Sequence, residues 1–143
     1  MAGRIHIRRA RPEDLIAVRE LWRQVSAEVG VGEPPPTGDG RLFVAHRGRQ
    51  LVGCALVALE PDRAARITDV AVAQDARSRG VGRALVEAAV AWARDRDVCS
   101  VIVDAAEVAL GFWHAVGFEG AGTRLQRPAI KPADSLTPTE RPG

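Results

Sequence analysis

One short stretch of this chain carries arginines and glycines at a spacing suited to binding an anion. It reads Arg77-Ser78-Arg79-Gly80-Val81-Gly82-Arg83-Ala84-Leu85, and residues 77–84 are called the anion loop below. The apolar run 67–73 before it favours a strand, and apolar residues at helical spacing after it favour a helix that ends near residue 95. The first amides of a helix have no internal partner and lie at the positive end of its dipole. A strand, a glycine turn and a helix start therefore predict an anion site.

Other phosphate-binding motifs fit this stretch less well. A P-loop needs Gly-Lys followed by Ser or Thr, whereas Lys131 is the only lysine in the chain. A dinucleotide fingerprint needs a third small residue, and the pair Gly80 and Gly82 is not followed by one at the required position. The remaining alternative is a tight turn that binds nothing, because glycine is frequent in turns of every kind.

Two motifs in sequence order resemble those of a known family. The pattern Arg77-x-x-Gly80-x-Gly82, after a Val-Ala-Val strand, resembles the acyl-CoA pyrophosphate loop of the GCN5-related N-acetyltransferase (GNAT) family. The pattern Ala109-x-x-Phe112-Trp113-x-x-x-Gly117-Phe118 resembles the C-terminal helix of that family, and a strand over 98–104 is expected between the two. The close resemblance covers about residues 65–118.

This resemblance implies both a fold and an activity. The implied fold is a single α/β (α+β) domain, with a central, mostly antiparallel sheet whose one parallel strand pair splays apart, flanked by helices. The implied activity is transfer of acetyl from acetyl-CoA to a primary amine, on a small molecule or a protein, by direct attack in a ternary complex. The residues expected to bind the co-substrate are Val70, Ala71, Val72, Arg77, Ser78, Arg79, Gly80, Val81, Gly82, Arg83, Ala84, Phe112 and Trp113.

The usual proton donor of the family is missing from this chain. Many members place a tyrosine near the CoA sulfur, but the matching residue here is Trp113 and the chain has no tyrosine. An indole N–H donates a hydrogen bond but does not deliver a proton at useful pH. The neighbouring His114 is a candidate for this role. The alternative is a solvated histidine, since adjacent helix residues point about 100° apart.

Three carboxylates are candidates for removing the proton of the amine. Asp69 lies in the strand expected to present the thioester, where an unpaired acid is costly to bury, and a salt bridge with an arginine is the alternative. Asp104 ends the next strand, where it could instead cap the following helix. Glu28 lies in the segment that commonly shapes the acceptor pocket in this family. Cys54, in an apolar strand pattern, is expected to be a buried core residue.

Two further departures from the family pattern concern the end of the chain. Ala106 stands where members often have an asparagine that bonds to the pantetheine side. The segment after Phe118 is short and rich in proline. The last hairpin, which usually closes the acceptor site in this family, is therefore expected to be either abbreviated or supplied by a second subunit, and the second alternative predicts a homodimer.

Composition fits one small soluble domain. The 143 residues are 46% hydrophobic and 27% charged, with a net charge of +2, too small to argue for nucleic acid or membrane as a partner. Cys54 and Cys99 show no paired spacing, so neither a disulfide framework nor a metal site is expected. The absence of a signal peptide or a long apolar run predicts a cytoplasmic protein.

The order of elements along the chain agrees with the implied fold. Strands are expected over 5–9, 41–46, 51–59, 67–73, 98–104 and 120–127, with a first helix through residues 15–25. The domain is expected to span 1–127, and the proline-containing segment 128–143 is expected to be a flexible tail. Two other functions stay open at this point: an acyl-CoA-binding sensor without catalysis, and an unrelated α/β domain that binds another phosphate ligand or RNA.

Overall fold

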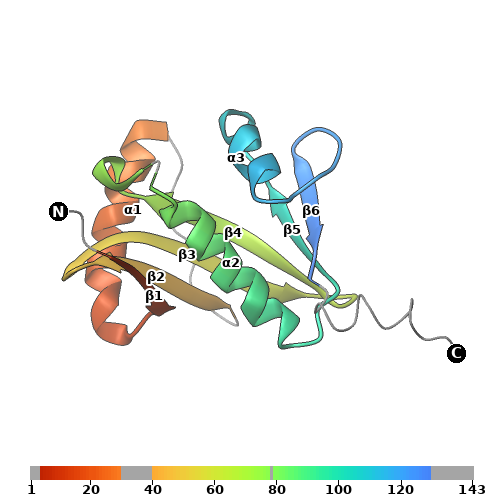
Figure 1. Cartoon of the computed structure of the whole chain (residues 1–143), viewed down its shortest axis with the longest axis horizontal. Helices are drawn as coiled ribbons and strands as arrows, with labels where there is room; N and C mark the ends of the chain where they lie inside the picture. Colours follow the sequence, from red (N-terminus) through yellow and green to blue (C-terminus); the bar gives the residue numbers. More distant parts are fainter. Residues whose placement is uncertain (1–3, 30–39, 78, 130–143) are drawn as a thin grey trace, which may run out of the picture. The chain divides into compact units, whose positions relative to one another are not determined.

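The structure, a computed structural model, describes residues 4–29, 40–77 and 79–129. The contacts of the chain divide it into two compact units, which are described separately. Unit 1 comprises Met1–Ala58 and Ile67–Ala89, and unit 2 comprises Leu59–Arg66 and Val90–Gly143. Within the described residues, six strands form one sheet in the order β1-β2-β3-β4-β5-β6 (Figure 1).

The predicted fold class is confirmed. The structure is a mixed α/β fold with a mostly antiparallel sheet that includes one parallel pair and is flanked by helices. The splaying of that parallel pair stays a prediction.

Unit 1 contains the N-terminal strands and the helix that follows the anion loop. A 3-10 turn at Pro12–Asp14 leads into the first helix, as proline at a first helical position favours. The antiparallel strands β1, β2 and β3 follow the predicted hairpin, with Val44 opposite Cys54 and Ala45 opposite Gly53. The elements are β1 (Ile5–Arg9), α1 (Leu15–Val29), β2 (Arg41–Arg47), β3 (Gln50–Glu60), β4 (Ala64–Val72) and α2 (Val81–Arg94), of which β3, β4 and α2 continue into unit 2.

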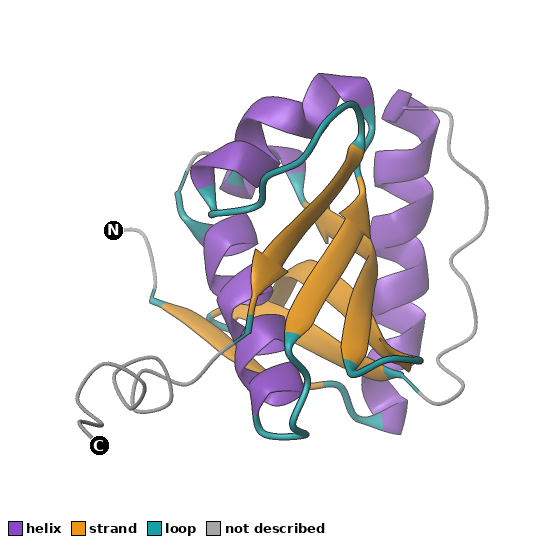
Figure 2. Cartoon of the chain, turned by 90° about the vertical axis from the view of Figure 1, so that its right-hand side faces the viewer, coloured by secondary structure: helices purple, strands orange, loops and turns teal. Residues whose placement is uncertain are grey.

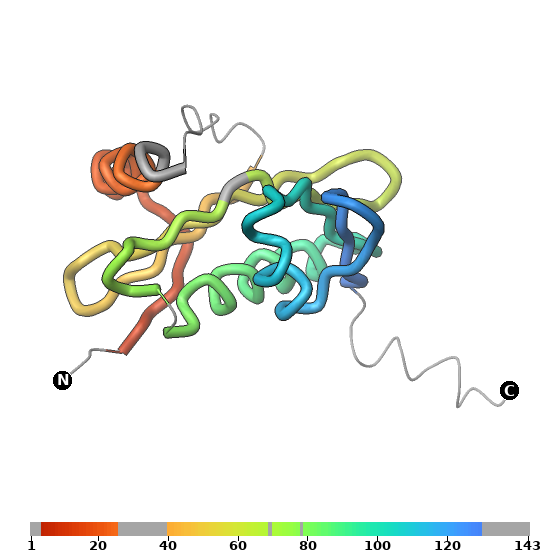
Figure 3. Tube along the Cα trace, turned by 90° about the horizontal axis from the view of Figure 1, so that it is seen from above, coloured from red at the N-terminus to blue at the C-terminus, as the bar shows by residue number. Residues whose placement is uncertain are grey.

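Helices cover both faces of the strands in unit 1. On one face, Val18, Leu21 and Trp22 of α1 pack with Val44, Cys54 and Ala71 of the strands, so Cys54 is the buried core residue that its apolar strand predicts. Figure 3 shows α1 in orange on one side of the strands and the first part of α2 in green on the other. Apolar side chains at positions 18, 21 and 22 lie on one side of a 3.6-residue helix, which is why α1 packs by this stripe.

A glycine allows α2 to approach the sheet closely on the other face. A Cβ on Gly53 would lie 2.9 Å from Cδ1 of Leu85 and 3.0 Å from Cγ1 of Val81. Both side chains are fully buried and come from the first turns of α2. Any larger residue at position 53 would therefore push the start of this helix away from β3.

Unit 2 contains the C-terminal strands and the last helix. Strands β5 (Ser100–Asp104) and β6 (Arg124–Pro128) pair antiparallel, with Ile102 opposite Gln126. Helix α3 (Leu110–Ala115) follows a 3-10 turn at Glu107–Ala109. In Figure 2, which faces this end of the chain, the connection from α3 to β6 is the long teal segment above the strands.

The end of α3 has the predicted glycine cap. Gly117 adopts a φ of +98°, a conformation that residues with a Cβ rarely take. The turn is closed by hydrogen bonds from the Gly117 N–H to the His114 carbonyl at 3.1 Å and from the Phe118 N–H to the Trp113 carbonyl at 3.0 Å. Phe118, fully buried, then enters the core of unit 2.

Some boundaries differ from those expected from the sequence. Strand β4 begins at Ala64, three residues earlier than the apolar run suggested, because it pairs within the sheet beyond that run. Strand β6 begins at Arg124 and continues to Pro128, and the Ala129 N–H donates to the Cys99 carbonyl at 2.9 Å. The described part of the chain thus includes two residues of the segment 128–143. The remainder of the expected tail lies outside the described residues.

In the described residues no helix combines the length and apolar character needed to cross a membrane.

A partly buried ion pair lies at the start of α1. The Arg8 guanidinium donates to both carboxylate oxygens of Asp14, at 2.7 and 3.0 Å, and the Arg11 N–H donates to the same carboxylate at 2.6 Å. The hydrogen bonds from Arg8 lower the pKa of Asp14 from 3.8 to about 2, against the opposing effect of burial. Burial and the charge of Arg8 lower the pKa of the nearby His46.

This pair makes stability depend on pH in the acid range. Because the folded pKa of Asp14 is depressed, its contribution is complete above pH 4 and is lost as the pH falls through about 2. We expect Asp14→Asn to lower the free energy of unfolding by about 2 kcal/mol at pH 7. The difference from the wild type should shrink between pH 4 and pH 2, measured by urea unfolding. Equal loss at pH 7 and pH 2 would contradict this account.

Candidate co-substrate and catalytic site

The anion loop has the predicted strand–turn–helix geometry. Strand β4 ends at Val72, a 3-10 turn follows at Gln74–Ala76, and α2 begins at Val81. Gly80 turns the chain into the helix with a φ of +83°, and its carbonyl accepts the Ala84 N–H at 3.0 Å as the first bond of α2. The preceding amides of the first turn are those that a helix leaves without an internal carbonyl. Ser78, one of the expected contact residues, lies outside the described residues.

The side chains of the anion loop divide between the core and the surface. Val81 is 1% exposed, so its side chain is used in packing and only its backbone amide can serve a ligand. Gly82 and Ala84 are half-buried. Arg79 and Arg83 are exposed, which leaves their charges at the surface around the turn. A Cβ on Gly80 would meet no atom within 4 Å among the described residues, so the space in front of this turn is open on the protein side.

Arg77 is linked to the strand that precedes the loop. Its Nε donates to the Val72 carbonyl at 3.0 Å, although its side chain is exposed. This bond holds the first arginine of the motif beside the end of β4.

The three expected contact residues of β4 alternate between two environments. Ala71 is buried in the core formed with α1, whereas Val70 and Val72 are half-buried. A strand presents successive side chains to opposite faces, so this pattern is the expected one. The side chains of Asp69 and Glu28, two of the candidate bases, lie outside the described residues.

Trp113 is a core residue of unit 2. It is 6% exposed and makes edge-to-face contacts with Phe112 and Phe118, with ring centroids 5.0 and 5.1 Å apart. Such aromatic pairs stabilise a core beyond the area they bury. The Trp113 side chain therefore packs in this core, while Phe112 is only half-buried.

His114 has one ring nitrogen engaged. Its Nδ1 lies 3.0 Å from the Phe118 carbonyl oxygen, and the side chain is exposed. A carbonyl can only accept, so the proton of this bond belongs to Nδ1. This bond orients the ring, and Nε2 is the other ring nitrogen, which faces away from the Phe118 carbonyl.

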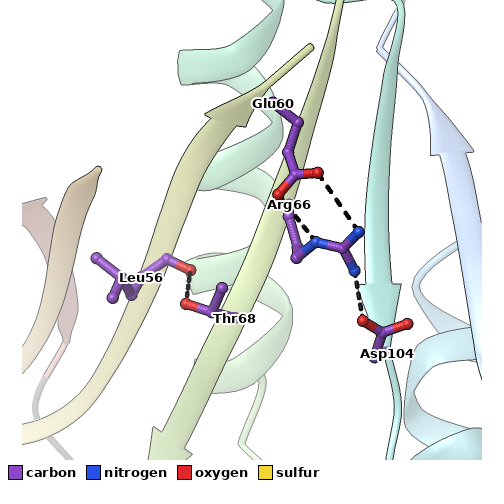
Figure 4. A network of polar contacts seen from close by, with 5 residues as sticks. All are labelled: Leu56, Glu60, Arg66, Thr68 and Asp104. Carbon is purple, nitrogen blue, oxygen red and sulfur yellow. Dashed lines mark hydrogen bonds and ion pairs between the residues drawn. The ribbon is translucent and has the colours of Figure 1, made fainter. Parts of the chain in front are cut away.

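Asp104 belongs to a network of three charged residues (Figure 4). The Arg66 guanidinium donates to Glu60 at 3.1 and 3.4 Å and also donates to the Asp104 carboxylate. These bonds, with that to Glu60 the largest cause, raise the pKa of Arg66. Asp104 therefore ties the end of β5 to Arg66 of β4, rather than capping the next helix. The Thr68 hydroxyl in the same view donates to the Leu56 carbonyl at 3.4 Å.

Sequence reasoning did not identify Arg66 or Glu60. The spacing within each strand carried no sign of their pairing, since Arg66 and Asp104 are 38 residues apart in the chain. Only the opposite charges near the adjoining ends of the third and fourth strands could have suggested the pairing of Glu60 with Arg66.

Among the described residues, no group of three or more His, Cys, Asp or Glu is placed to hold a metal ion. Cys54, which is buried, and Cys99, which is exposed, do not form a disulfide with each other.

Comparison with known proteins identifies the family. Residues 11–118 match the model of the acetyltransferase (GNAT) family. This match begins after β1, and it covers α1, the anion loop and α3. The chain belongs to this family, whose enzyme class is that of the acyl-CoA-dependent N-acyltransferases.

Individual proteins similar to this chain match it over a short segment or at low sequence identity. Streptothricin acetyltransferase A of Bacillus subtilis (strain 168) is 36% identical over 50 residues, which are 35% of this chain and only 29% of that protein. A crystal structure of nourseothricin acetyltransferase has a TM-score of 0.70 and 22% identity, covering 87% of this chain and 98% of that one. The PaiA N-acetyltransferase of Thermoplasma acidophilum, solved with coenzyme A, has a TM-score of 0.71 and 14% identity, covering 87% and 99%. These two structures share the fold of this chain.

The open space at Gly80 gives a direct test of the anion loop. We expect Gly80→Asp to weaken acetyl-CoA binding about 30-fold, because a carboxylate within about 4 Å of a phosphate costs about 2 kcal/mol. Calorimetric titration measures this change. Gly80→Ala is the matched control, since it has the same strain at positive φ but adds no charge. Equal affinity in a folded Gly80→Asp variant would place the phosphates elsewhere.

Proposed function

We propose that this protein is an N-acetyltransferase that transfers acetyl from acetyl-CoA to a primary amine by direct attack in a ternary complex. The observation that carries the proposal is the match of residues 11–118 to an acetyltransferase family, together with the helix start at Gly80 inside that match. We assign residues 1–127 to the acetyltransferase domain.

The anion loop is proposed to bind the pyrophosphate of the co-substrate. The first-turn amides near Val81 and Gly82 would donate to the phosphate oxygens, as helix N-termini do for anions. Arg77, Ser78, Arg79 and Arg83 would add positive charge. The backbone of residues 70–72 is proposed to pair with the amide-bearing pantetheine arm, in the manner of a peptide added to a strand. Phe112 and Trp113 would bound the thioester end of this site.

The reaction requires one proton to leave the amine and one to reach sulfur. The neutral amine attacks the thioester carbonyl carbon, a C–N bond forms, the C–S bond breaks and the thiolate departs. Because a free thiol has a pKa of about 8.5, the thiolate leaves without an obligatory acid, but an acid accelerates the step. We propose the doubly protonated, imidazolium form of His114 as this acid, giving the proton on Nε2 to sulfur while Nδ1 keeps its own.

We propose that one of two carboxylates acts as the general base. Asp69 and Asp104 are the candidates for taking the amine proton, directly or through water. The Asp104 carboxylate already accepts a hydrogen bond from Arg66.

The acceptor is proposed to be a small-molecule amine or a protein amine. The curated relative is named for streptothricin and one similar structure for nourseothricin, so these two compounds come first in an acceptor screen, beside a peptide α-amine. We also propose a homodimer, in which a second subunit completes the acceptor site, and a cytoplasmic location, where the thiols of Cys54 and Cys99 would stay reduced. A monomeric mass in solution would contradict the dimer.

A second function is favoured by one observation. Trp113 replaces the usual tyrosine and is packed between two aromatic rings, an arrangement that serves stability. The alternative is therefore an acyl-CoA-binding sensor or interaction module of the same fold that has lost catalysis.

Calorimetric titration with acetyl-CoA tests the proposal first. We expect micromolar binding of acetyl-CoA and none of ATP or NAD at similar concentrations, followed by release of free thiol when an accepted amine is added. Binding without thiol release across the acceptor screen would favour the sensor. Absence of binding in a folded sample would contradict both functions.

The role of His114 gives a second prediction. We expect His114→Ala to lower kcat about 100-fold, the low end of the range for loss of a general acid, with little change in acetyl-CoA affinity. Stopped assays of free thiol measure kcat. His6→Ala, which removes an exposed histidine from β1, is the control and should retain full activity. An active His114→Ala variant would show that another group protonates the thiolate.

A further inference from the structure

The β2–β3 hairpin contacts the chain both before the anion loop and within it. Before the loop, the Ala73 N–H donates to the Val52 carbonyl at 2.8 Å. Within the loop, Val81 packs against Gly53, the next residue of β3, within the distance that only a glycine permits. Both contacts are thus made by consecutive residues of one strand, all within unit 1.

A charged pair adds a third contact between the hairpin and the loop. Nη2 of Arg47, at the end of β2, lies 3.3 Å from Oδ2 of Asp75 in the 3-10 turn, and 3.5 Å from Oε1 of Gln50. The Arg47 side chain is only 19% exposed, whereas that of Asp75 is 66% exposed. Arginine rarely gives up this much hydration without a partner. Arg47 thus extends from the hairpin to Asp75, a largely exposed residue of the 3-10 turn.

The position of Asp75 is unexpected for an anion site. It stands two residues before Arg77, in a segment whose other charges are positive. A carboxylate there opposes phosphate binding through its field, so its presence needs a reason. The bond to Arg47 supplies one, because it fixes the 3-10 turn from which the anion loop departs.

We propose that Arg47 and Asp75 form a positioning pair that holds the anion loop in the geometry required by the CoA pyrophosphate. The inference rests on the proposed function. Neither residue contacts the ligand in this account. They act by placing the first-turn amides, whose hydrogen bonds to phosphate are strong only within a narrow range of about 2.7–3.2 Å.

Calorimetric and kinetic comparison of single and double variants tests the pair. We expect Arg47→Ala to weaken acetyl-CoA binding about fivefold, equivalent to about 1 kcal/mol. Asp75→Asn should cause a similar loss, although it removes a negative charge near the phosphates. The double variant should bind no more weakly than either single variant, because both changes break the same contact. The KM for acetyl-CoA should rise to the same extent, while kcat and the KM for the amine stay unchanged.

Arg49→Ala is the matched control for charge. Arg49 is exposed in the same turn, two residues from Arg47, so its removal changes the local field by the same single charge. It should leave acetyl-CoA affinity nearly unchanged. The melting temperatures of all variants should equal that of the wild type, since a partly exposed ion pair adds little to stability.

Three results would overturn the inference. An equal loss in Arg49→Ala would reduce the effect to net charge, and tighter binding by Asp75→Asn would make Asp75 a mere opposing charge. Wild-type affinity in all variants would show that the loop holds its geometry without the pair. If the wild type itself bound no acetyl-CoA, the proposed function would fail, and this inference with it.

Discussion

The close approach of α2 to β3 is the constraint on which the anion loop depends. Gly53 lets Val81 and Leu85 reach the strand, and the packing of these buried side chains fixes the height of the first helical turn above the sheet. The backbone amides of that turn are the groups that an anion would meet. A packing contact in the core, which never touches a ligand, therefore sets the position of the atoms proposed to bind one.

The loop itself is short and its side chains are divided between two tasks. Val81 anchors it in the core, and the positive φ of Gly80 turns the chain into the helix. The arginines remain at the surface, where their charge attracts an anion at long range without having to order the backbone. Contacts with the β2–β3 hairpin at Ala73 and Asp75 provide that order instead.

In α3, a residue that packs in the core stands at the position where many family members have a proton donor. Trp113 stands where many family members have a tyrosine. Its ring packs between those of Phe112 and Phe118. The bond of His114 to the Phe118 carbonyl belongs to the same turn, which closes after Gly117. The stability of unit 2 and the orientation of the His114 ring thus both depend on this one short segment. A substitution that disturbs its packing would therefore also change the orientation of the ring.

The sequence by itself determined the features that local rules govern. The strand before the anion loop, the helix start after Gly80 and the glycine cap at Gly117 follow from backbone preferences within a few residues. The buried position of Cys54 follows from the apolar run around it. The family followed from two motifs in order, each of which is also local.

Only the tertiary structure decided the partners of the charged residues. Asp104 meets Arg66 at a separation of 38 residues and Asp75 meets Arg47 at 28, and no periodicity in the sequence encodes such pairs. The same holds for Gly53. By sequence alone a glycine weakens a strand, and only the packing of α2 against it shows why it is needed. Contacts of this kind depend on how strands and helices meet in three dimensions, and that arrangement is fixed by the packing of the whole core rather than by any one segment.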